Sequence, residues 1–385
     1  MKIALVHKRL DLRGGTERDL FRTAEGLRDL GHEVHLFCSE FQVAPPQNVI
    51  AHRVPVIPLG RTLRLWSFAW LGGRAVEQAH CDVVVGFGRL PHQHVLRSGG
   101  GTHRGFLKQM EQAGGLRRRI WQNLSLYHRS LLAIEKRQYD GLKSRRIVAV
   151  SERTKQDIVA QYSVPAEKIT VLYNGVDLTR FHPMKRKEHR QQIRKRWNIP
   201  EDAHLVLFVG SGFRRKGLDR LLSIWKSSSL DRVFLLVVGG DARLDRYQAR
   251  ADLIAPGRVV FAGRQEHVEN YYAAADILAL PSLQEAFGNV VLEALAAGLP
   301  VLVSSEVGAA EIIRGPLSEG IVNVNNGTET IQRKLLWLLE KSKDPWWASQ
   351  ARSLAEENSW EDHFRRLEAL LLETCQSSAG ANHRI

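Results

Sequence analysis

Short apolar strands alternate with helical segments, and this alternation runs through the chain twice; no other feature restricts the fold as strongly. In the first half, strand-like runs lie at residues 3–7, 33–38, 82–87 and 146–150. The pattern starts again in the second half, at residues 205–209, 233–238, 259–262, 276–280 and 301–304. Strands separated by helices predict parallel, doubly wound sheets. The sequence therefore predicts an α/β protein of two Rossmann-like domains with a ligand cleft between them.

The helical segments between these strands carry start and stop signals. Residues 16–30 place apolar side chains at helical spacing, and Ser151 is a candidate N-cap for a helix that ends near Tyr162. Further helices are expected at 218–227, 290–297 and 359–374, with a frayed end at 376–385. A chain of 385 residues is also long enough for two domains of about 180 residues. We place these domains at 1–178 and 179–358, followed by a helix and tail at 359–385.

Composition is typical of a globular protein, with 44% apolar and 25% charged residues. No apolar run reaches the roughly 18–20 residues that a membrane-spanning helix requires. The three cysteines, Cys38, Cys81 and Cys375, are scattered and lack the spacing of metal ligands. We therefore expect reduced thiols and a cytosolic compartment.

Positive charge is concentrated in the first half. Residues 1–180 hold 28 Lys and Arg against 16 Asp and Glu, whereas residues 181–385 hold 27 against 25, out of a net charge of +14. Residues 97–146 alone carry twelve basic and three acidic side chains, and the basic ones include Arg117, Arg118, Arg119, Arg145 and Arg146. Such a patch attracts a polyanion or an anionic membrane face. A solvated basic surface without a dedicated partner is an equal alternative.

The segment 282–300 holds two carboxylates, Glu285 and Glu293, around the start of a predicted helix that follows a strand. A helix N-terminus suits phosphate, because its first N–H groups lack intrahelical partners and carry partial positive charge. Carboxylates bind phosphate poorly but accept hydrogen bonds from sugar hydroxyls. The segment therefore favours a nucleotide sugar. An alternative stays open, in which Ser282-x-x-Glu285 is a capping box and Glu293 an ordinary solvated residue.

A second constellation is the cationic loop 210–217, between a predicted strand and helix. It holds Arg214, Arg215 and Lys216, but neither the Gly-Lys-Ser/Thr of a Walker loop nor the glycine spacing of a dinucleotide fingerprint. Cations at the carboxyl end of a strand are placed to hold a diphosphate. The alternative is a basic loop that only precedes a helix.

Two glycine loops lie in the first half. Gly14-Gly15, after the first strand, allows close backbone approach to a ligand at a helix start, although a tight turn explains it equally well. The loop 98–105 contains three consecutive glycines and His103, which is able to supply a hydrogen bond or a proton. Because the chain has fifteen histidines, the presence of His103 is by itself weak evidence for a function. No Ser–His–Asp, Cys–His or Asp-x-Asp pattern is recognisable.

With these motifs in place, the chain resembles glycosyltransferase family 4, the retaining GT-B enzymes, over most of its length. Within this family it is similar to the lipopolysaccharide core glucosyltransferase I group. The resemblance is carried by Glu285-x7-Glu293 and by three further segments, 14–19 (GGTERD), 172–177 (LYNGVD) and 209–220 (VGSGFRRKGLDR). The triple glycine near His103 departs from those glucosyltransferases, so the acceptor and the exact donor sugar stay open.

The resemblance implies a GT-B fold of two facing Rossmann-like domains, with the donor held mostly by the second. It also implies that the helix near Trp360 crosses back to the first domain. Arg215 and Lys216 correspond to the diphosphate clamp, Glu293 to the ribose-binding carboxylate and Glu285 to the residue that faces the transferred sugar. Other implied donor-site residues are Gly15, Asp19, Arg180, Phe287, Gly288, Asn289 and Val290, and His103 corresponds to the cleft histidine.

These residues suit metal-independent transfer. Cleavage of a sugar–diphosphate bond leaves negative charge on the leaving phosphate, which Arg215, Lys216 and helix N–H groups are placed to stabilise. With two cations present, we expect no metal and no cofactor beyond a donor such as UDP-glucose. Our mechanistic hypothesis is same-face transfer, in which the departing phosphate oxygen takes the acceptor's proton and Glu285 acts in binding rather than as a nucleophile.

The expected function is therefore hexosyl transfer to a lipopolysaccharide core or related saccharide. The basic first domain is expected to hold the enzyme at the inner face of the cytoplasmic membrane, and we expect no nucleic-acid partner. Rival readings are a sugar-nucleotide epimerase or a phosphorylase on the same architecture, a dinucleotide oxidoreductase that uses Asp241, and a nucleic-acid-binding protein. The last has charge in its favour but no recognition motif.

Overall fold

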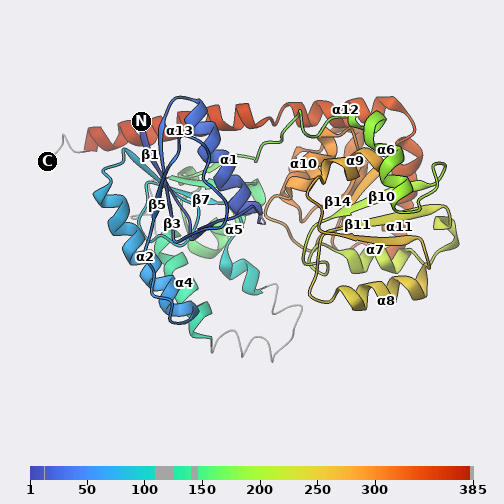
Figure 1. Cartoon of the computed structure of the whole chain (residues 1–385), viewed down its shortest axis with the longest axis horizontal. Coiled ribbons are helices and arrows are strands. Elements are labelled where there is room, and N and C mark those ends of the chain that lie inside the picture. Colours follow the sequence, from blue (N-terminus) through green and yellow to red (C-terminus); the bar gives the residue numbers. More distant parts are fainter. Residues whose placement is uncertain (13, 109–124, 140–145, 382–385) are drawn as a thin grey trace. The chain divides into compact units, whose positions relative to one another are not determined.

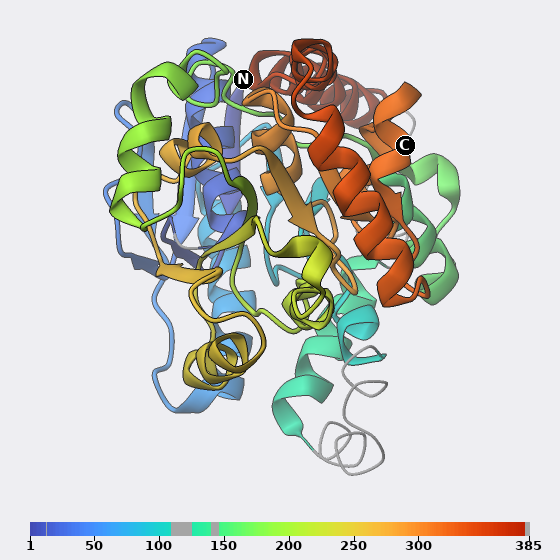
Figure 2. The ribbon, with the colours of Figure 1, turned by 90° about the vertical axis from the view of Figure 1, so that its right-hand side faces the viewer.

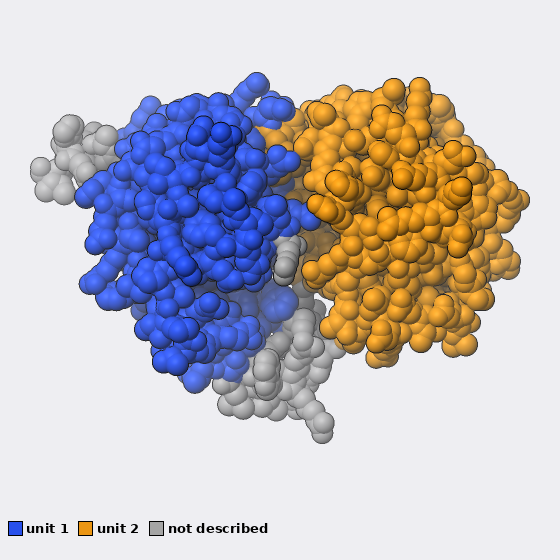
Figure 3. Space-filling model, in the orientation of Figure 1, with its two compact units in different colours: residues 1–174, 361–385 blue, residues 175–360 orange. Residues whose placement is uncertain are grey.

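The computed structural model describes residues 1–12, 14–108, 125–139 and 146–381. The chain divides into two compact units, coloured separately in Figure 3. Unit 1 comprises residues 1–174 and 361–385, and unit 2 comprises residues 175–360. The first division therefore follows Asn174, whereas the sequence placed it after residue 178.

Unit 1 is built on a parallel sheet of seven strands in the order β5-β3-β1-β6-β7-β8-β9. Its strands are β1 (Lys2–Val6), β3 (Glu33–Cys38), β5 (Ile50–Arg53), β6 (Val83–Gly86), β7 (Val95–Ser98), β8 (Arg146–Ala149) and β9 (Ile169–Val171), and a separate parallel pair is formed by β2 (Arg9–Leu10) and β4 (Glu40–Phe41). Its helices are α1 (Gly15–Asp29), α2 (Gly60–Gln78), α4 (Leu126–Tyr139), α5 (Glu152–Tyr162) and α13 (Trp360–Ala381), with a 3₁₀ turn at Ala166–Lys168.

Both faces of this sheet are buried, because successive side chains of a strand point to opposite sides. In β1, Ile3 and Leu5 belong to one apolar core, whereas Ala4 and Val6 belong to another. The first core is closed by α1 and α13, and the second by α2. The alternation in the strand therefore determines which helices cover which face.

The last helix, α13, packs against unit 1. Leu367 and Leu371 are fully buried in the same core as the first strand. Gly26 of α1 lies against the ring of Phe364, where a Cβ atom would meet the ring at 2.1 Å. His32 Nε2 lies 2.8 Å from Glu368 Oε1. Figure 1 shows α13 crossing near the end of α1, and the leucines of α13 complete the core of the first unit.

Unit 2 has a second parallel sheet, of six strands in the order β12-β11-β10-β13-β14-β15. The strands are β10 (His204–Val209), β11 (Val233–Val238), β12 (Val259–Gly263), β13 (Ile277–Leu280), β14 (Val301–Ser304) and β15 (Ile321–Val322). The helices are α6 (Lys185–Arg196), α7 (Leu218–Ile224), α8 (Leu244–Ile254), α9 (Glu269–Ala274), α10 (Asn289–Ala296), α11 (Thr328–Lys341) and α12 (Pro345–Glu356). 3₁₀ turns lie at Ser228–Leu230, Gly308–Ile312 and Gly315–Gly320.

The strand order of unit 2 reverses at β10, and the helices follow this reversal. The chain moves outward from β10 to β11 and β12, returns, and continues from β13 to β14 on the other side. Right-handed crossovers therefore place α7 and α8 on one face of the sheet and α9 and α10 on the other (Figures 1 and 2). Such a reversal opens a crevice at the carboxyl ends of the two central strands.

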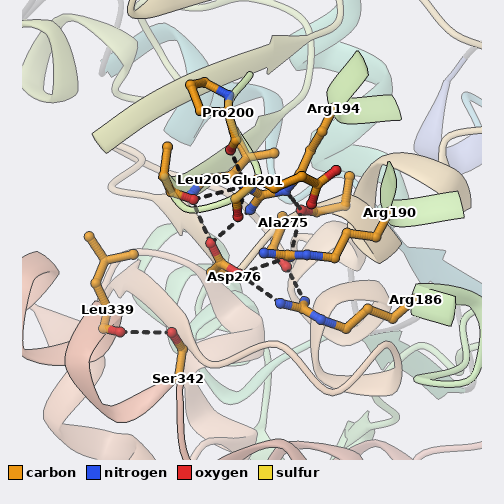
Figure 4. A network of polar contacts seen from close by, with 12 residues as sticks. Arg186, Arg190, Arg194, Pro200, Glu201, Leu205, Ala275, Asp276, Leu339 and Ser342 are labelled. Atoms are coloured by element: carbon orange, nitrogen blue, oxygen red, sulfur yellow. Dashed lines mark hydrogen bonds and ion pairs between the residues drawn. The ribbon is translucent and has the colours of Figure 1, made fainter. Parts of the chain in front are cut away.

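Three arginines of α6 converge on one carboxylate, that of Asp276, which directly precedes β13 (Figure 4). Arg186 Nη2 and Arg190 Nη1 donate to Asp276 Oδ1 at 2.7 and 3.0 Å, and Arg194 Nη2 donates to Oδ2 at 3.0 Å. The backbone N–H of Leu205 donates to Oδ2 as well, at 2.8 Å. Burial by itself raises the pKa of Asp276, but Arg190, Arg194 and this N–H keep it below its usual value.

The structure confirms most predicted elements and corrects some. The strands at 33–38, 233–238 and 301–304 and the cap at Ser151, whose side chain accepts from Thr154 N, are as expected. The predicted helix at 218–227 ends at Ile224. The last helix continues to Ala381, so the frayed end expected from residue 376 is wrong. The polar segment Lys185–Arg196, for which no helix was predicted, forms α6.

We expect Asp276→Asn to destabilise unit 2 by about 3 kcal/mol at neutral pH, because it leaves the buried Arg194 without its counter-charge. The folded pKa of Asp276 is lowered, so its stabilisation is present above the unfolded pKa and is lost as the pH falls through the folded pKa. Urea denaturation at pH 7 and at strongly acidic pH measures both effects. The matched control is Asp202→Asn, which breaks an exposed pair with Arg232 and should cost ~0–1 kcal/mol. Equal losses in the two variants would refute the argument.

Candidate active site

Two loops meet at the crevice of unit 2, the one after β10 (210–217) and the one after β13 (281–288). Gly217 has φ +83°, and a Cβ atom there would lie 2.1 Å from the carbonyl oxygen of Pro281. The backbone N–H of Leu283 donates to the carbonyl of Arg215 at 2.8 Å. Only glycine allows this backbone approach. The two segments that the sequence analysis singled out are therefore joined directly.

At this junction Glu285 forms ion pairs with both predicted clamp residues. Lys216 Nζ lies 2.7 Å from Glu285 Oε2, and Arg215 Nη1 donates to the same oxygen. The side chain of Lys216 is 9% exposed and that of Arg215 42%. Burial favours the neutral acid, but the charges of Lys216 and Arg215 keep the pKa of Glu285 below its usual value. Two cations face one carboxylate, so the cluster has a surplus positive charge for an anionic ligand.

Helix α10 begins beside this cluster. Its N-cap is Gly288, with φ +92°, where a Cβ atom would meet Val307 at 2.7 Å. Phe287, 2% exposed, precedes it, and its carbonyl accepts from Ala309 N at 2.8 Å. The first helical residue is Asn289, followed by Val290. The capping-box reading of Ser282 and Glu285 is therefore wrong, because the helix starts only after both residues.

The second carboxylate of the motif, Glu293, lies inside α10 and has a different partner. Its Oε2 accepts a hydrogen bond from the hydroxyl of Tyr272 at 2.6 Å. Glu293 is half-buried. The two acids therefore have different partners. Glu285 is ion-paired with Lys216 and Arg215, whereas Glu293 accepts a hydrogen bond from a tyrosine hydroxyl.

A cavity of about 640 Å³ lies at the carboxyl ends of β10, β11 and β12. It is lined by Gly212, Gly240, Asp241, Ala242, Arg243 and Arg264. The oxygens of Asp241 accept the backbone N–H groups of Phe213 at 2.8 Å and of Arg243 at 2.9 Å. Asp241 therefore fixes two loops of this cavity. From the sequence Asp241 was a candidate only for an oxidoreductase, and Arg264, which lies in no local motif, was not a candidate at all.

Arg180, another predicted donor residue, is held within unit 2 by Glu269. Its Nε and Nη2 atoms donate to Glu269 Oε2 at 3.0 and 2.8 Å. The guanidinium also lies 5.5 Å from the centre of the Phe181 ring.

Unit 1 has a cavity of about 290 Å³ of its own, at the carboxyl ends of β1, β6 and β7. It is lined by residues that follow each strand, which include His7, Lys8, Thr16, Glu17, Phe87, Arg89, Arg97, the loop 98–102, His103 and Phe106. His7 Nδ1 lies 3.1 Å from the carbonyl oxygen of Phe87. His7, whose Nε2 lies 3.7 Å from Glu17 Oε1, lowers the pKa of Glu17 to about 2 in spite of its burial. The cavity is therefore polar, with one ionised carboxylate among several basic groups.

Gly15 and Asp19 lie on α1 with different surroundings. Gly15 is the first residue of the helix, and no atom lies within 4 Å of a Cβ built there. Asp19 is 2% exposed, and its two oxygens accept from Arg97 Nε at 2.5 Å and Arg97 Nη2 at 3.0 Å. Arg97 Nη2 also donates to Asn174 Oδ1 at 2.8 Å. Asp19 therefore orders the interior of unit 1, beneath the cavity.

His103 lines the cavity of unit 1, and its ring contacts a second histidine. Its Nε2 lies 3.1 Å from His128 Nδ1, and its ring stacks on Phe106. Burial, followed by the charges of Arg89 and His128, lowers the pKa of His103 to about 4. The imidazole is thus neutral at physiological pH and suited to hydrogen bonding rather than to charge stabilisation.

Part of the basic patch at 97–146 lies outside the described residues. Arg117, Arg118, Arg119 and Arg145 lie outside the described residues, whereas Arg146 belongs to β8 and donates to the carbonyl of Glu167 at 3.2 Å. Within the described part of the chain no group of three or more His, Cys, Asp or Glu side chains is arranged to hold a metal ion. In the same residues no helix is long and apolar enough to span a membrane.

Each half of the chain matches a known protein family. The profile of the Glycosyl transferases group 1 family matches residues 189–358, and that of Glycosyltransferase Family 4 matches residues 13–180. The chain belongs to the family 4 glycosyltransferases. It is 29% identical over 351 residues to the lipopolysaccharide glucosyltransferase WaaG of Escherichia coli K12. This alignment covers 89% of this chain and 91% of WaaG. The resemblance found in the sequence is therefore confirmed, as is the enzyme class, a hexosyltransferase.

Solved structures agree with this assignment. The crystal structure of WaaG, a glycosyltransferase involved in lipopolysaccharide biosynthesis, superposes with a TM-score of 0.80 at 25% identity, covering 96% of this chain and 99% of WaaG. The structure of Anabaena HepE in complex with UDP-glucose has a TM-score of 0.71 at 18% identity, covering 98% of this chain and the whole of HepE, and shows the fold alone. The predicted GT-B fold, with two parallel-sheet α/β domains, is thus confirmed. The family binds a nucleotide-sugar donor and a saccharide acceptor.

The pairing of Glu285 with Lys216 and Arg215 gives a prediction about nucleotide binding. A diphosphate must compete with the Glu285 carboxylate for the same two cations, so Glu285→Gln should tighten the binding of UDP by about tenfold, equivalent to ~1.4 kcal/mol. Glu293→Gln, which changes a carboxylate hydrogen-bonded to Tyr272, should not tighten it. Isothermal titration calorimetry with UDP measures both. Unchanged or weaker UDP binding by Glu285→Gln would show that the carboxylate does not compete.

Proposed function

We propose that this enzyme is a retaining hexosyltransferase that moves glucose from UDP-glucose onto a lipopolysaccharide core or a related saccharide. The observation that carries the proposal is the cluster of Lys216, Arg215 and Glu285 at the crevice of unit 2. It combines surplus positive charge for a diphosphate with a carboxylate for sugar hydroxyls. A nucleotide sugar carries its diphosphate directly next to its sugar, so it is able to contact the two cations and the carboxylate at once.

In this proposal the donor lies along the carboxyl edge of the unit 2 sheet. Arg215 and Lys216 hold the diphosphate, and Glu293, half-buried beside Tyr272, accepts the ribose hydroxyls. The base occupies the 640 Å³ cavity, where the guanidinium of Arg264 offers a planar surface for stacking. The hexose lies against Glu285 and the backbone of Phe287, Gly288, Asn289 and Val290.

The remaining predicted residues have supporting roles in the proposal. Gly15 gives the donor phosphates access to the start of α1. Arg180 is presented through its pair with Glu269, and Asp19 acts through Arg97 rather than by direct contact. His103, neutral at physiological pH, accepts or donates one hydrogen bond to a sugar hydroxyl.

We infer that the chemical step is same-face transfer without a metal. As the sugar–phosphate bond breaks, charge develops on the leaving phosphate oxygen, next to Lys216 and Arg215. That oxygen takes the proton of the acceptor hydroxyl as the new bond forms on the same face of the sugar. Glu285 is ion-paired with two cations, which makes it a poor nucleophile. Mass spectrometry that detects a sugar covalently bound to Glu285 would contradict this mechanism.

The identity of donor and acceptor rests on relatives. The E. coli relative is named a lipopolysaccharide glucosyltransferase, and it matches this chain along nearly its whole length. The HepE structure, which shares the fold, contains UDP-glucose. The name of the E. coli relative supports glucose as the transferred sugar and a lipopolysaccharide core as the acceptor, whereas HepE, at 18% identity, shares the fold alone.

We expect UDP-glucose to raise the melting temperature of the protein, because a ligand at 100 times its Kd stabilises the state that binds it by about 2.7 kcal/mol. Differential scanning fluorimetry should show a smaller shift with GDP-mannose or ADP-glucose. Lys216→Ala should abolish the shift, because the diphosphate loses its most buried cation. Lys187→Ala, on the exposed side of α6, is the matched control and should retain it. The proposal fails if no nucleotide sugar shifts the transition.

We further propose that the enzyme works in the cytoplasm, peripherally attached to the inner face of the cytoplasmic membrane. The support is the charge distribution, with nearly all of the net +14 in residues 1–180. A lipopolysaccharide precursor lies in an anionic leaflet, which attracts such a basic segment.

Binding to vesicles with an anionic headgroup should be strong at low salt and weaken several-fold at 0.5 M NaCl, because the attraction is screened. Replacing Arg117, Arg118 and Arg119 by Gln should weaken it too. The matched control replaces Lys187, Lys195 and Arg196 of α6 by Gln, with the same loss of charge in unit 2 and no expected effect. Vesicle co-sedimentation decides, and salt-independent binding would refute the electrostatic attachment.

A further inference from the structure

Glu135, on α4, is a fully buried carboxylate that the reaction described above does not use. Its side chain is 0% exposed. Its Oε2 accepts the backbone N–H of His103 at 2.7 Å and Arg89 Nη1 at 3.3 Å. Its Oε1 accepts the hydroxyl of Tyr162 at 2.7 Å and the backbone N–H of Arg104 at 3.3 Å. Four donors from three separate parts of unit 1 therefore converge on one side chain.

Two of these donors belong to residues that line the cavity of unit 1, whereas Glu135 does not line it. Arg89 follows β6, and His103 follows the glycine loop after β7; both face the 290 Å³ cavity. Arg89 is 31% exposed, so its guanidinium is accessible to a ligand while Glu135 holds it. Glu135 thus fixes two cavity groups from behind.

The glycine loop is the part of the cavity that needs such an anchor. Residues 99–101 are glycines with no side chain to pack, and the nearest atoms to Cβ positions built at Gly99 and Gly100 lie at 3.7 Å or more. A glycine run has high conformational entropy, so its path is determined by what holds its ends. One end is held by Ser98, whose hydroxyl lies 2.8 Å from that of Tyr139. The other end is held by the two N–H groups on Glu135.

We propose that Glu135 is a positioning residue for the saccharide acceptor: it fixes Arg89, His103 and the end of the glycine loop in the arrangement that the acceptor requires. This inference rests on the proposed function. It assigns to α4 a role that the motifs in the sequence do not indicate. It also gives a reason why a carboxylate, costly to bury, is retained there.

Glutamine at this position separates positioning from bulk stability. It preserves the shape of the side chain but has one acceptor oxygen for four donors, and its amide group must face some of them. It also removes the negative charge opposite Arg89. We therefore expect Arg89, His103 and the glycine loop of unit 1 to be held less firmly. The residues proposed to bind the nucleotide sugar in unit 2 keep their own contacts.

The experiment compares Glu135→Gln with the wild-type enzyme, with UDP-glucose as donor and lipopolysaccharide truncated before its first core glucose as acceptor. We expect the KM for the acceptor to rise about tenfold or more. We expect the Kd for UDP, the KM for UDP-glucose and the slow hydrolysis of UDP-glucose without acceptor to change less than twofold. This split between acceptor and donor parameters is a readout that general destabilisation would not produce.

Tyr162→Phe is the matched control. It removes one donor from the same carboxylate but leaves Arg89 and His103 in place, so the KM for the acceptor should change less than threefold. If Glu135→Gln does not fold, Arg89→Gln provides a second test, because it removes the cavity group that Glu135 holds and should raise the same KM.

The outcomes separate the two proposals. An unchanged KM for the acceptor in Glu135→Gln, or equal losses on the donor and acceptor sides, overturns the positioning role alone. Failure of the wild-type enzyme to bind or turn over UDP-glucose overturns the proposed function and this inference with it.

Discussion

The reversal of strand order next to the first strand of each sheet is the constraint on which the sites depend. In unit 1 it falls between β1 and β6, and in unit 2 between β10 and β13. Because crossovers are right-handed, the helices on the two sides of the reversal go to opposite faces, and the loops at the carboxyl ends separate there. The cation loop and the Glu285 loop are the two loops at this point in unit 2. The cavity of unit 1 lies at the corresponding place in its own sheet.

Asp276, Glu285 and Glu135 are three carboxylates with different charged surroundings, and these surroundings suggest a different role for each. Asp276 is surrounded by arginines that also donate to backbone carbonyls, as Arg194 does to Ala203. These arginines are fully engaged, and the network ties α6 to the sheet. Glu285 instead is ion-paired with two cations, Lys216 and Arg215. An anionic ligand that displaces the carboxylate is able to form ion pairs with both cations. Glu135 has backbone N–H groups as two of its four partners, which is the pattern of a group that fixes a loop.

Several parts of this description follow from local sequence. Strands and helices were predictable because burial on both faces produces continuous apolar runs, and because apolar residues in helices repeat with a period near 3.6. The two loops that hold Arg215, Lys216 and Glu285 were also recognisable from the sequence, since each lies between a predicted strand and a predicted helix. The start of α10 was not: the capping-box pattern competed with a glycine that adopts a left-handed conformation, and the glycine determines where the helix begins.

What the sequence by itself determined was the α/β architecture and the family, because these depend on periodicity and on short segments of fixed spacing. Only the tertiary structure decided how the charged residues are paired. The contacts Lys216–Glu285, Arg194–Asp276 and Arg89–Glu135 join residues that are 69, 82 and 46 positions apart along the chain. Ion pairs and hydrogen bonds of this kind depend on distance in space, and a local sequence pattern does not give the distance between residues that are far apart in the chain. For the same reason Glu135 and Arg264, which belong to no motif, became visible only once the strands had brought their neighbours together.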